Sequence, residues 1–229
     1  MIPTTATSSI TTFSGFSGFS GDFEAHITVR ADGPADVAAL EAHAGARGVK
    51  FTHIVLDRGR TPSQPMLTLR GRGALEEVRG GVEEAARALR EDGFDVVRTK
   101  IEATPWAEGV PGTDEEAVAL GERYYFEHHV KLLLSPGADT AALADVASRR
   151  AAHLSRNARR VRADGRTERF VTQRCRLVGG RTAQERLDAL VAALRTRCDE
   201  IVSVEREFVV HDSDESLDAG WIDEEGTGR

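Results

Sequence analysis

Two histidines hold matching places in the two halves of this chain of 229 residues. Both His26 and His129 lie two positions after a Phe-Glu pair, and 103 residues separate them. Imidazole titrates near neutral pH, so two histidines that flank a substrate can work as general base and general acid. We therefore predict that His26 and His129 are catalytic and face one cleft.

Further polar side chains are expected on the same face as these histidines. Successive side chains of a strand point to opposite faces of the sheet. This alternation turns Ile27 towards the covering helices, and it turns His26, Glu102 and Glu207 towards the other, open face. The residues predicted to contact a ligand there are Glu24, Thr28, Thr68, Arg70, Lys100, Glu127, Lys131, Thr172 and Arg174.

The predicted ligand is a small anion. Arg70 and Arg174 hold matching positions in the two halves. A guanidinium group binds a phosphate or a carboxylate through forked hydrogen bonds. Together with the two histidines, these arginines favour a phosphorylated or nucleotide-like molecule.

The segment His26-Ile27-Thr28-Val29 resembles the His-x-Thr motif of the 2H phosphoesterases. Members of that family carry two such motifs on strands of a duplicated α/β fold. Each His acts as acid or base on a cyclic or 2′,5′ phosphodiester, and each Thr or Ser holds the phosphate. The resemblance implies phosphoester chemistry at His26 and His129. It covers two short strands only, and the second departs from the motif, because Lys131 stands where the hydroxyl belongs.

Metal binding is the main alternative for these side chains. Imidazole and carboxylate groups are common ligands of zinc, manganese and iron. However, the candidates show no tight spacing motif, and His128 is expected to point towards its own helices as a hydrogen-bonded core residue. We therefore assign neither a metal nor a cofactor. The candidate ligands are Glu24, His26, His53, Glu127, His128 and His129.

The predicted elements occur twice in the order β-α-β-β-α-β, which is typical of a ferredoxin-like unit. The first unit covers 22–104, an acidic connector covers 105–121, and the second unit covers 122–211. Strands are predicted at 23–29, 49–56, 66–70, 94–103, 126–132, 158–163, 170–177 and 201–210. Apolar residues at helical spacing predict helices that begin near 37, 75, 141 and 187, the third of them extending to 152. The fold class is α+β, a tandem duplication of a ferredoxin-like βαββαβ unit with a polar cleft between the two sheets.

The open faces carry His, Arg, Lys, Glu and Thr, and stripping such charges of water is costly unless they are paired. This cost favours a polar cleft or a wet barrel between the copies. Two separate sheets with solvated faces are the alternative. The competing function is a non-enzymatic binding or assembly module that uses the open faces, with a homo-oligomer as one outcome.

The net charge of −7 argues against general binding of nucleic acid. Two cysteines are too few for a disulfide framework. No apolar run approaches the roughly 20 residues that span a bilayer, and the N-terminus has no basic, apolar leader. We therefore expect no membrane partner and a cytoplasmic location.

Both ends of the chain are predicted to lie outside the two units. Residues 1–21 are rich in Ser, Gly and Phe, a composition that predicts disorder. Residues 212–229 form an acidic tail that begins as a capped turn. Alternatively, this tail covers the mouth of the cleft or binds a cation. Trp106 and Trp221 are both expected to pack against neighbouring surfaces.

Overall fold

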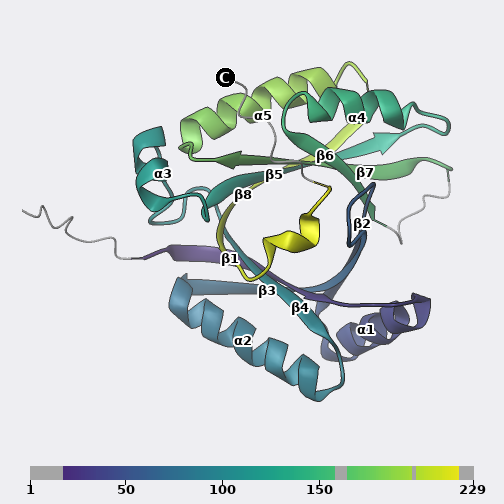
Figure 1. Cartoon of the computed structure of the whole chain (residues 1–229), viewed down its shortest axis with the longest axis vertical. Helices are drawn as coiled ribbons and strands as arrows, with labels where there is room; N and C mark the ends of the chain where they lie inside the picture. Colours follow the sequence, from purple (N-terminus) through teal and green to yellow (C-terminus); the bar gives the residue numbers. More distant parts are fainter. Residues whose placement is uncertain (1–17, 158–163, 198–199, 222–229) are drawn as a thin grey trace, which may run out of the picture.

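Eight strands form one closed antiparallel barrel in the computed structural model, which describes residues 18–157, 164–197 and 200–221 (Figure 1). Around the barrel they follow the order β1-β3-β2-β6-β7-β5-β8-β4, and β4 closes the ring by pairing with β1. The strands are β1 (Ser20–Val29), β2 (Lys50–Leu56), β3 (Ser63–Ala74), β4 (Val96–Ala103), β5 (Tyr125–Leu134), β6 (Ala152–Asn157), β7 (Thr167–Arg176) and β8 (Glu200–Asp212). The chain thus has a mixed α/β fold with an antiparallel sheet.

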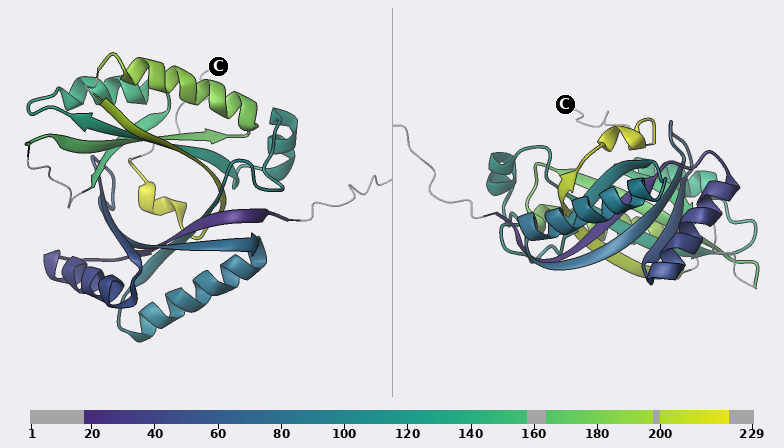
Figure 2. Two further views of the ribbon diagram at one scale, coloured as in Figure 1. Left: turned by 180° about the vertical axis from the view of Figure 1, so that it is seen from behind. Right: turned by 90° about the horizontal axis from the view of Figure 1, so that it is seen from below.

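Two layers of helices cover opposite sides of the barrel (Figure 2). Strands β1 to β4 carry α1 (Pro34–Arg47) and α2 (Leu75–Glu91), and strands β5 to β8 carry α4 (Thr140–Ser148) and α5 (Gly180–Leu194). The short helix α3 (Asp114–Leu120) lies in the connector between the halves. Each half therefore shows the predicted order β-α-β-β-α-β.

The apolar cores lie between the barrel and its helices. The predicted alternation is confirmed in β1, where Ile27 is 1% exposed and packs in the first core cluster. In the second half, Val130 and Leu132 of β5 pack with Leu187 and Leu190 of α5. Because one face of each strand is buried against helices, the polar face of the same strand must point into the barrel.

The two sheets expected from the sequence are one continuous sheet. At one junction, residues 54–56 of β2 pair with residues 155–157 of β6. At the other, residues 100–103 of β4 pair with β8. Strand edges carry unpaired N–H and C=O groups, and closure of the barrel satisfies them. The second predicted arrangement, with separate solvated sheets, is therefore wrong.

The sixth strand lies earlier than the prediction of 158–163. Helix α4 ends at Ser148, four residues before the predicted end, and Ala151 takes a left-handed conformation with φ of 50°. The strand then uses residues 152–157, in which Ala152 and Leu154 supply the apolar face. The predicted strand itself lies outside the described residues.

The first strand begins inside the segment predicted to be disordered. Strand β1 starts at Ser20, because Phe19 is buried and its ring packs against the rings of Tyr124 and Phe208. The boundary predicted at 21 is thus too late, and residues 1–17 lie outside the described part of the chain. The acidic tail begins as the predicted capped turn, because the Asp214 side chain accepts a hydrogen bond from the Ser216 N–H. Residues 213–221 fold back across one end of the barrel, with the short helix η1 (Glu215–Asp218) among them (Figures 1 and 2).

Cys175 is a free, buried thiol, whereas Cys198 lies outside the described residues. Among the described helices, none has the length and apolar character needed to cross a bilayer.

We expect Phe19→Ala to lower the free energy of unfolding by about 3 kcal/mol, because it empties a buried aromatic site. Urea denaturation followed by circular dichroism measures this change. Trp106→Ala is the control, since its side chain is 72% exposed and its loss should change stability by less than about 0.5 kcal/mol. Equal effects of the two substitutions would show that Phe19 does not belong to the core.

Candidate functional site

The inward strand faces enclose a cavity of about 360 Å³. Its lining comes from both halves of the chain and includes most of the residues predicted from the sequence. Those present are Glu24, His26, Thr28, Lys100, Glu127, His129, Lys131, Thr172 and Arg174. The cavity thus lies where the alternation of side chains placed a polar interior.

The first histidine is held by two neighbouring strands. His26 on β1 contacts Thr68 Oγ1 on β3 through Nδ1, at 3.1 Å. Its Nε2 lies 3.0 Å from Glu102 Oε2 on β4 and 3.9 Å from Glu24 Oε1. The threonine therefore orients the ring, and Nε2 faces the carboxylates.

The second histidine has the same surroundings. His129 on β5 contacts Thr172 Oγ1 on β7 through Nδ1, at 3.0 Å. Its Nε2 lies 3.2 Å from Glu127 Oε1 and 3.3 Å from Glu207 Oε2 on β8. We call these two groups, Thr68–His26–Glu102 and Thr172–His129–Glu207, the Thr–His–Glu sets.

The register of the sheet makes the two sets equivalent. Thr68 pairs with His26 as Thr172 pairs with His129. Two residue pairs away, on the same face of the sheet, Glu102 lies opposite Glu24 as Glu207 lies opposite Glu127. The sets therefore match position by position in both halves.

The two sets also lie close together. One ligating atom each from Glu102, His129 and Glu207 all fall within 4.8 Å of one another. Glu102 belongs to the first set, so the sets meet at their carboxylate ends. Both imidazoles retain solvent contact, with side-chain exposures of 19% for His26 and 26% for His129.

Buried ion pairs hold the cations of the cavity. Lys100 Nζ lies 2.5 Å from Glu102 Oε1 and also pairs with Glu127. Arg174 donates to the other oxygen of Glu127 and to Asp218, each at 2.5 Å. Arg98 and Lys131 also have carboxylate partners. An anion that approached these cations would compete with carboxylates already in place.

The electrostatic surroundings shift several titrating groups of the second set. Burial alone would lower the pKa of His129, but Glu127 and Glu207 raise it to about 10. Burial would raise the pKa of Glu127, yet Lys100 holds it well below the ordinary value. For Glu207, burial and the charge of Glu102 both raise the pKa. In this state His129 thus carries a proton at neutral pH, between two carboxylates of different basicity.

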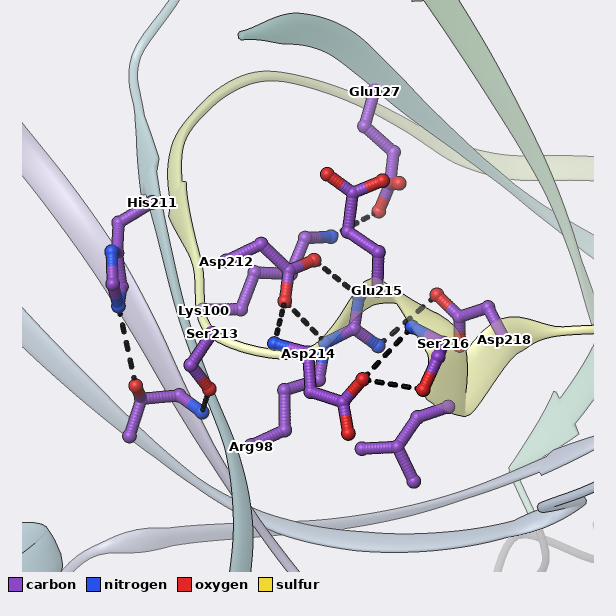
Figure 3. Close-up of polar contacts among 12 residues, drawn as sticks. Arg98, Lys100, Glu127, His211, Asp212, Ser213, Asp214, Glu215, Ser216 and Asp218 are labelled. Carbon is purple, nitrogen blue, oxygen red and sulfur yellow. Dashed lines mark hydrogen bonds and ion pairs between the residues drawn. The ribbon is translucent and has the colours of Figure 1, made fainter. Parts of the chain in front are cut away.

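The C-terminal segment 213–221 seals one end of the cavity, as Figure 3 shows for its polar contacts. Asp218 is 3% exposed and accepts hydrogen bonds from Arg98 at 3.0 Å and from Gln64 at 3.1 Å. Trp221 lines the cavity and donates from Nε1 to the carbonyl of Leu154 at 2.7 Å. Of the alternatives for this tail, covering the mouth of the cavity agrees with this arrangement.

Not every predicted residue lies in the cavity lining. Arg70 is 79% exposed at its side chain and binds Glu24 at 3.1 Å outside the lining. Thr68 does not line the cavity, but its Oγ1 contacts Nδ1 of His26. His128 is buried and its Nδ1 contacts Gln173 Oε1 at 3.1 Å, which confirms it as a hydrogen-bonded core histidine. His53 contacts Ser63 at 2.9 Å and does not line the cavity.

Four important residues were absent from the predicted site. Glu102 and Glu207 were placed on the correct face, and their separation of 105 residues, close to that of the histidines, was the signal that could have included them. Arg98 was also on that face. Asp218 carried no such signal, because it enters the cavity only when the chain turns back after β8.

Replacing Asp218 by Asn should lower the free energy of unfolding by about 1–3 kcal/mol, because two buried guanidinium groups lose a shared carboxylate, although Arg98 keeps Asp212 and Arg174 keeps Glu127. Chemical denaturation measures the loss. Asp95→Asn removes an exposed partner of Arg30 and should cost less than about 1 kcal/mol. A change at Asp218 no larger than the change at Asp95 would contradict the assigned ion pairs.

The same carboxylate should make the C-terminal segment sensitive to acid. Burial raises the pKa of Asp218, but Arg174 and Arg98 lower it further, to a net value below the ordinary 3.8. The stabilisation that ionised Asp218 gives is therefore complete above pH of about 4, and it disappears as the pH falls through the pKa that Asp218 has in the folded protein. The fluorescence of buried Trp221 should shift to longer wavelength over this range. In Asp218→Asn the shift should no longer follow this titration, and an identical pH profile in both proteins would refute the assignment.

No known protein family matches the chain, and no curated protein matches it. Solved structures with some likeness include the ligand-free regulatory subunit of aspartate kinase from Thermus thermophilus. It is 14% identical, with 76% of this chain and 92% of that chain covered and a TM-score of 0.30. A mutant chlorite dismutase from Candidatus Nitrospira defluvii is 13% identical over 87% of this chain and 93% of that chain, with a TM-score of 0.27. A dye-decolorizing protein from V. cholerae is 9% identical over 83% and 94%, with a TM-score of 0.26. Likeness at this level assigns neither a family nor an activity.

Proposed function

We propose that the two halves are copies of one βαββαβ unit and that the cavity between them is the functional site. The equal order of the elements and the matching registers of the Thr–His–Glu sets support this proposal. In a barrel built from two copies, equivalent side chains come from both halves and meet inside. The site therefore depends on both halves of one chain.

We propose that the cavity binds a small neutral or cationic molecule at the Thr–His–Glu sets. The observation that carries this proposal is that both imidazoles direct Nε2 towards carboxylates in one cavity. Buried polar groups give specificity when a ligand satisfies them. A ligand with hydrogen-bond donors or positive charge complements this surface.

The charges of the lining favour such a ligand over the phosphorylated one predicted from the sequence. Among the described lining residues, the carboxylates are Glu24, Glu102, Glu127, Glu205, Glu207 and Asp218. The lysines and arginines are Lys50, Arg98, Lys100, Lys131 and Arg174. Each of these cations has a carboxylate partner. An anion would have to displace a carboxylate and leave it buried, at a cost of several kcal/mol.

Two other functions were predicted from the sequence, acid–base catalysis and an assembly module. Acid–base chemistry at His26 and His129, including chemistry on a phosphoester, stays a prediction. The assembly module required that the polar sheet faces meet a partner. In the closed barrel these faces line the cavity, which favours a small molecule over a second protein as their partner. A homo-oligomer stays a prediction.

A thermal-shift screen should test the proposed ligand class. We expect hits among small cations and neutral polar molecules, and none among phosphorylated anions of similar size. At 100 times its dissociation constant, a ligand stabilises the fold by about 2.7 kcal/mol, which corresponds to roughly 5–10 °C for a chain of this length.

The variants His129→Ala and Glu207→Gln should lose these shifts, whereas His53→Ala should keep them because His53 does not line the cavity. Hits confined to phosphorylated anions would reverse the assigned ligand class. Hits that persist unchanged in His129→Ala and Glu207→Gln would move the binding site out of the cavity.

A further inference from the structure

We propose that the cavity holds a divalent transition-metal ion, bound by His26, His129, Glu102 and Glu207. This inference rests on the proposed function, since it takes the cavity as the ligand site and names the class of its cationic ligand. The four side chains come from β1, β5, β4 and β8, so residues from both halves are needed.

The spacing of the ligating atoms fits a metal ion. His26 Nε2 and Glu102 Oε2 are 3.0 Å apart, and His129 Nε2 and Glu207 Oε2 are 3.3 Å apart. Metal–ligand bonds of about 2.1 Å at angles of 90–109° separate neighbouring ligand atoms by roughly 3.0–3.4 Å. One ligating atom each from Glu102, His129 and Glu207 lie within 4.8 Å of one another, and His26 Nε2 adjoins this cluster through Glu102 Oε2, so His26 would supply the fourth ligand.

Each imidazole is oriented as a metal ligand would be. A ligating histidine usually donates its second ring N–H to a nearby oxygen, which fixes the tautomer and the angle of the ring. Thr68 and Thr172 stand at Nδ1 of His26 and His129, at 3.1 and 3.0 Å. With the Nδ1 proton donated to the threonine, the lone pair of Nε2 points at the cluster.

Glu102 can serve a metal and a lysine at the same time. Its Oε1 lies beside Lys100 Nζ, and its Oε2 faces His26. One oxygen is therefore free of the lysine and directed at the cluster. Lys100 also pairs with Glu127, so its charge is already divided between two carboxylates.

The carboxylates around the cluster outnumber their buried cationic partners. Around the cluster, the described carboxylates are Glu102, Glu127, Glu207, Asp212 and Asp218, and their buried cationic partners are Arg98, Lys100 and Arg174. These carboxylates outnumber the cations by two, and the proton on His129 offsets only one of the two charges; a metal ion would replace that proton at the imidazole. A divalent ion offsets that excess at the place where Glu102 and Glu207 approach each other.

The donor set indicates the kind of metal. Two imidazole nitrogens and two carboxylate oxygens suit Zn²⁺, Mn²⁺ or Fe²⁺, whereas Ca²⁺ and Mg²⁺ prefer oxygen ligands alone. Zn²⁺ and Mn²⁺ are the probes of choice, because neither needs protection from air during the experiment.

The test is calorimetric titration of the chelator-treated full chain with Zn²⁺ and with Mn²⁺. We expect one ion per chain for at least one of the two metals. His129→Ala and Glu207→Gln should weaken its binding by about 100-fold or more, and Thr172→Val by about tenfold through loss of the outer hydrogen bond. Glu200→Gln removes the same charge from the same strand at an exposed position outside the cavity lining and should change affinity less than about threefold. Circular dichroism spectra and melting temperatures establish that each variant is folded.

Two outcomes would overturn the inference. One is a folded native chain that binds neither metal. The other is binding that survives in the folded variants His129→Ala and Glu207→Gln. If the thermal-shift screen still finds a neutral ligand that needs His129, the metal fails while the proposed function stands. If neither assay finds a ligand in the cavity, both fall together.

Discussion

Closure of the sheet into a barrel turns the polar faces of eight strands into one interior. The site depends on one constraint, which is that the charges enclosed there must be paired. An unpaired buried charge costs several kcal/mol, so each cation needs a partner within reach. The structure meets this need with a chain of alternating charges. It runs from Asp212 through Arg98, Asp218, Arg174, Glu127 and Lys100 to Glu102 and His26. The C-terminal segment and the histidines thus belong to one electrostatic network.

This network also separates the two histidine sets, although the register of the sheet makes them equivalent. His26 lies opposite Lys100 on the neighbouring strand, whereas His129 lies opposite Glu205. A cation beside one ring and a carboxylate beside the other give the two imidazoles different surroundings. Arg70 and Arg174 differ more, since Arg70 is exposed beside Glu24 and Arg174 is buried between Glu127 and Asp218. The sets therefore share a geometry and differ in charge.

The periodicity of the sequence predicted which face of each strand a side chain occupies. Alternation assigned the correct face to His26, Thr28, Lys100 and their counterparts, because one face of each strand had to meet helices. Periodicity could not predict β6, since Ala152 and Leu154 are too few apolar residues to distinguish a strand from the end of a helix. Nor could it predict Phe19 in the core or Asp218 in the cavity. Both depend on contacts with residues more than a hundred positions away in the chain, Tyr124 for the first and Arg98 for the second.

Some carboxylates of the cavity contact a histidine and also hold the buried cations. Glu127 holds His129, Lys100 and Arg174 at once, so its removal would leave Lys100 with Glu102 alone and Arg174 with Asp218 alone. Such a substitution changes stability and binding together and cannot separate them. Glu207 is different, because burial and repulsion from Glu102 both raise its pKa, and a proton or a bound cation offsets both. Groups with such perturbed pKa values concentrate at sites that bind ligands or do chemistry. The proposed ion would therefore lie between Glu102 and Glu207, whose atoms approach each other within 4.8 Å, and the remaining ion pairs would form its scaffold.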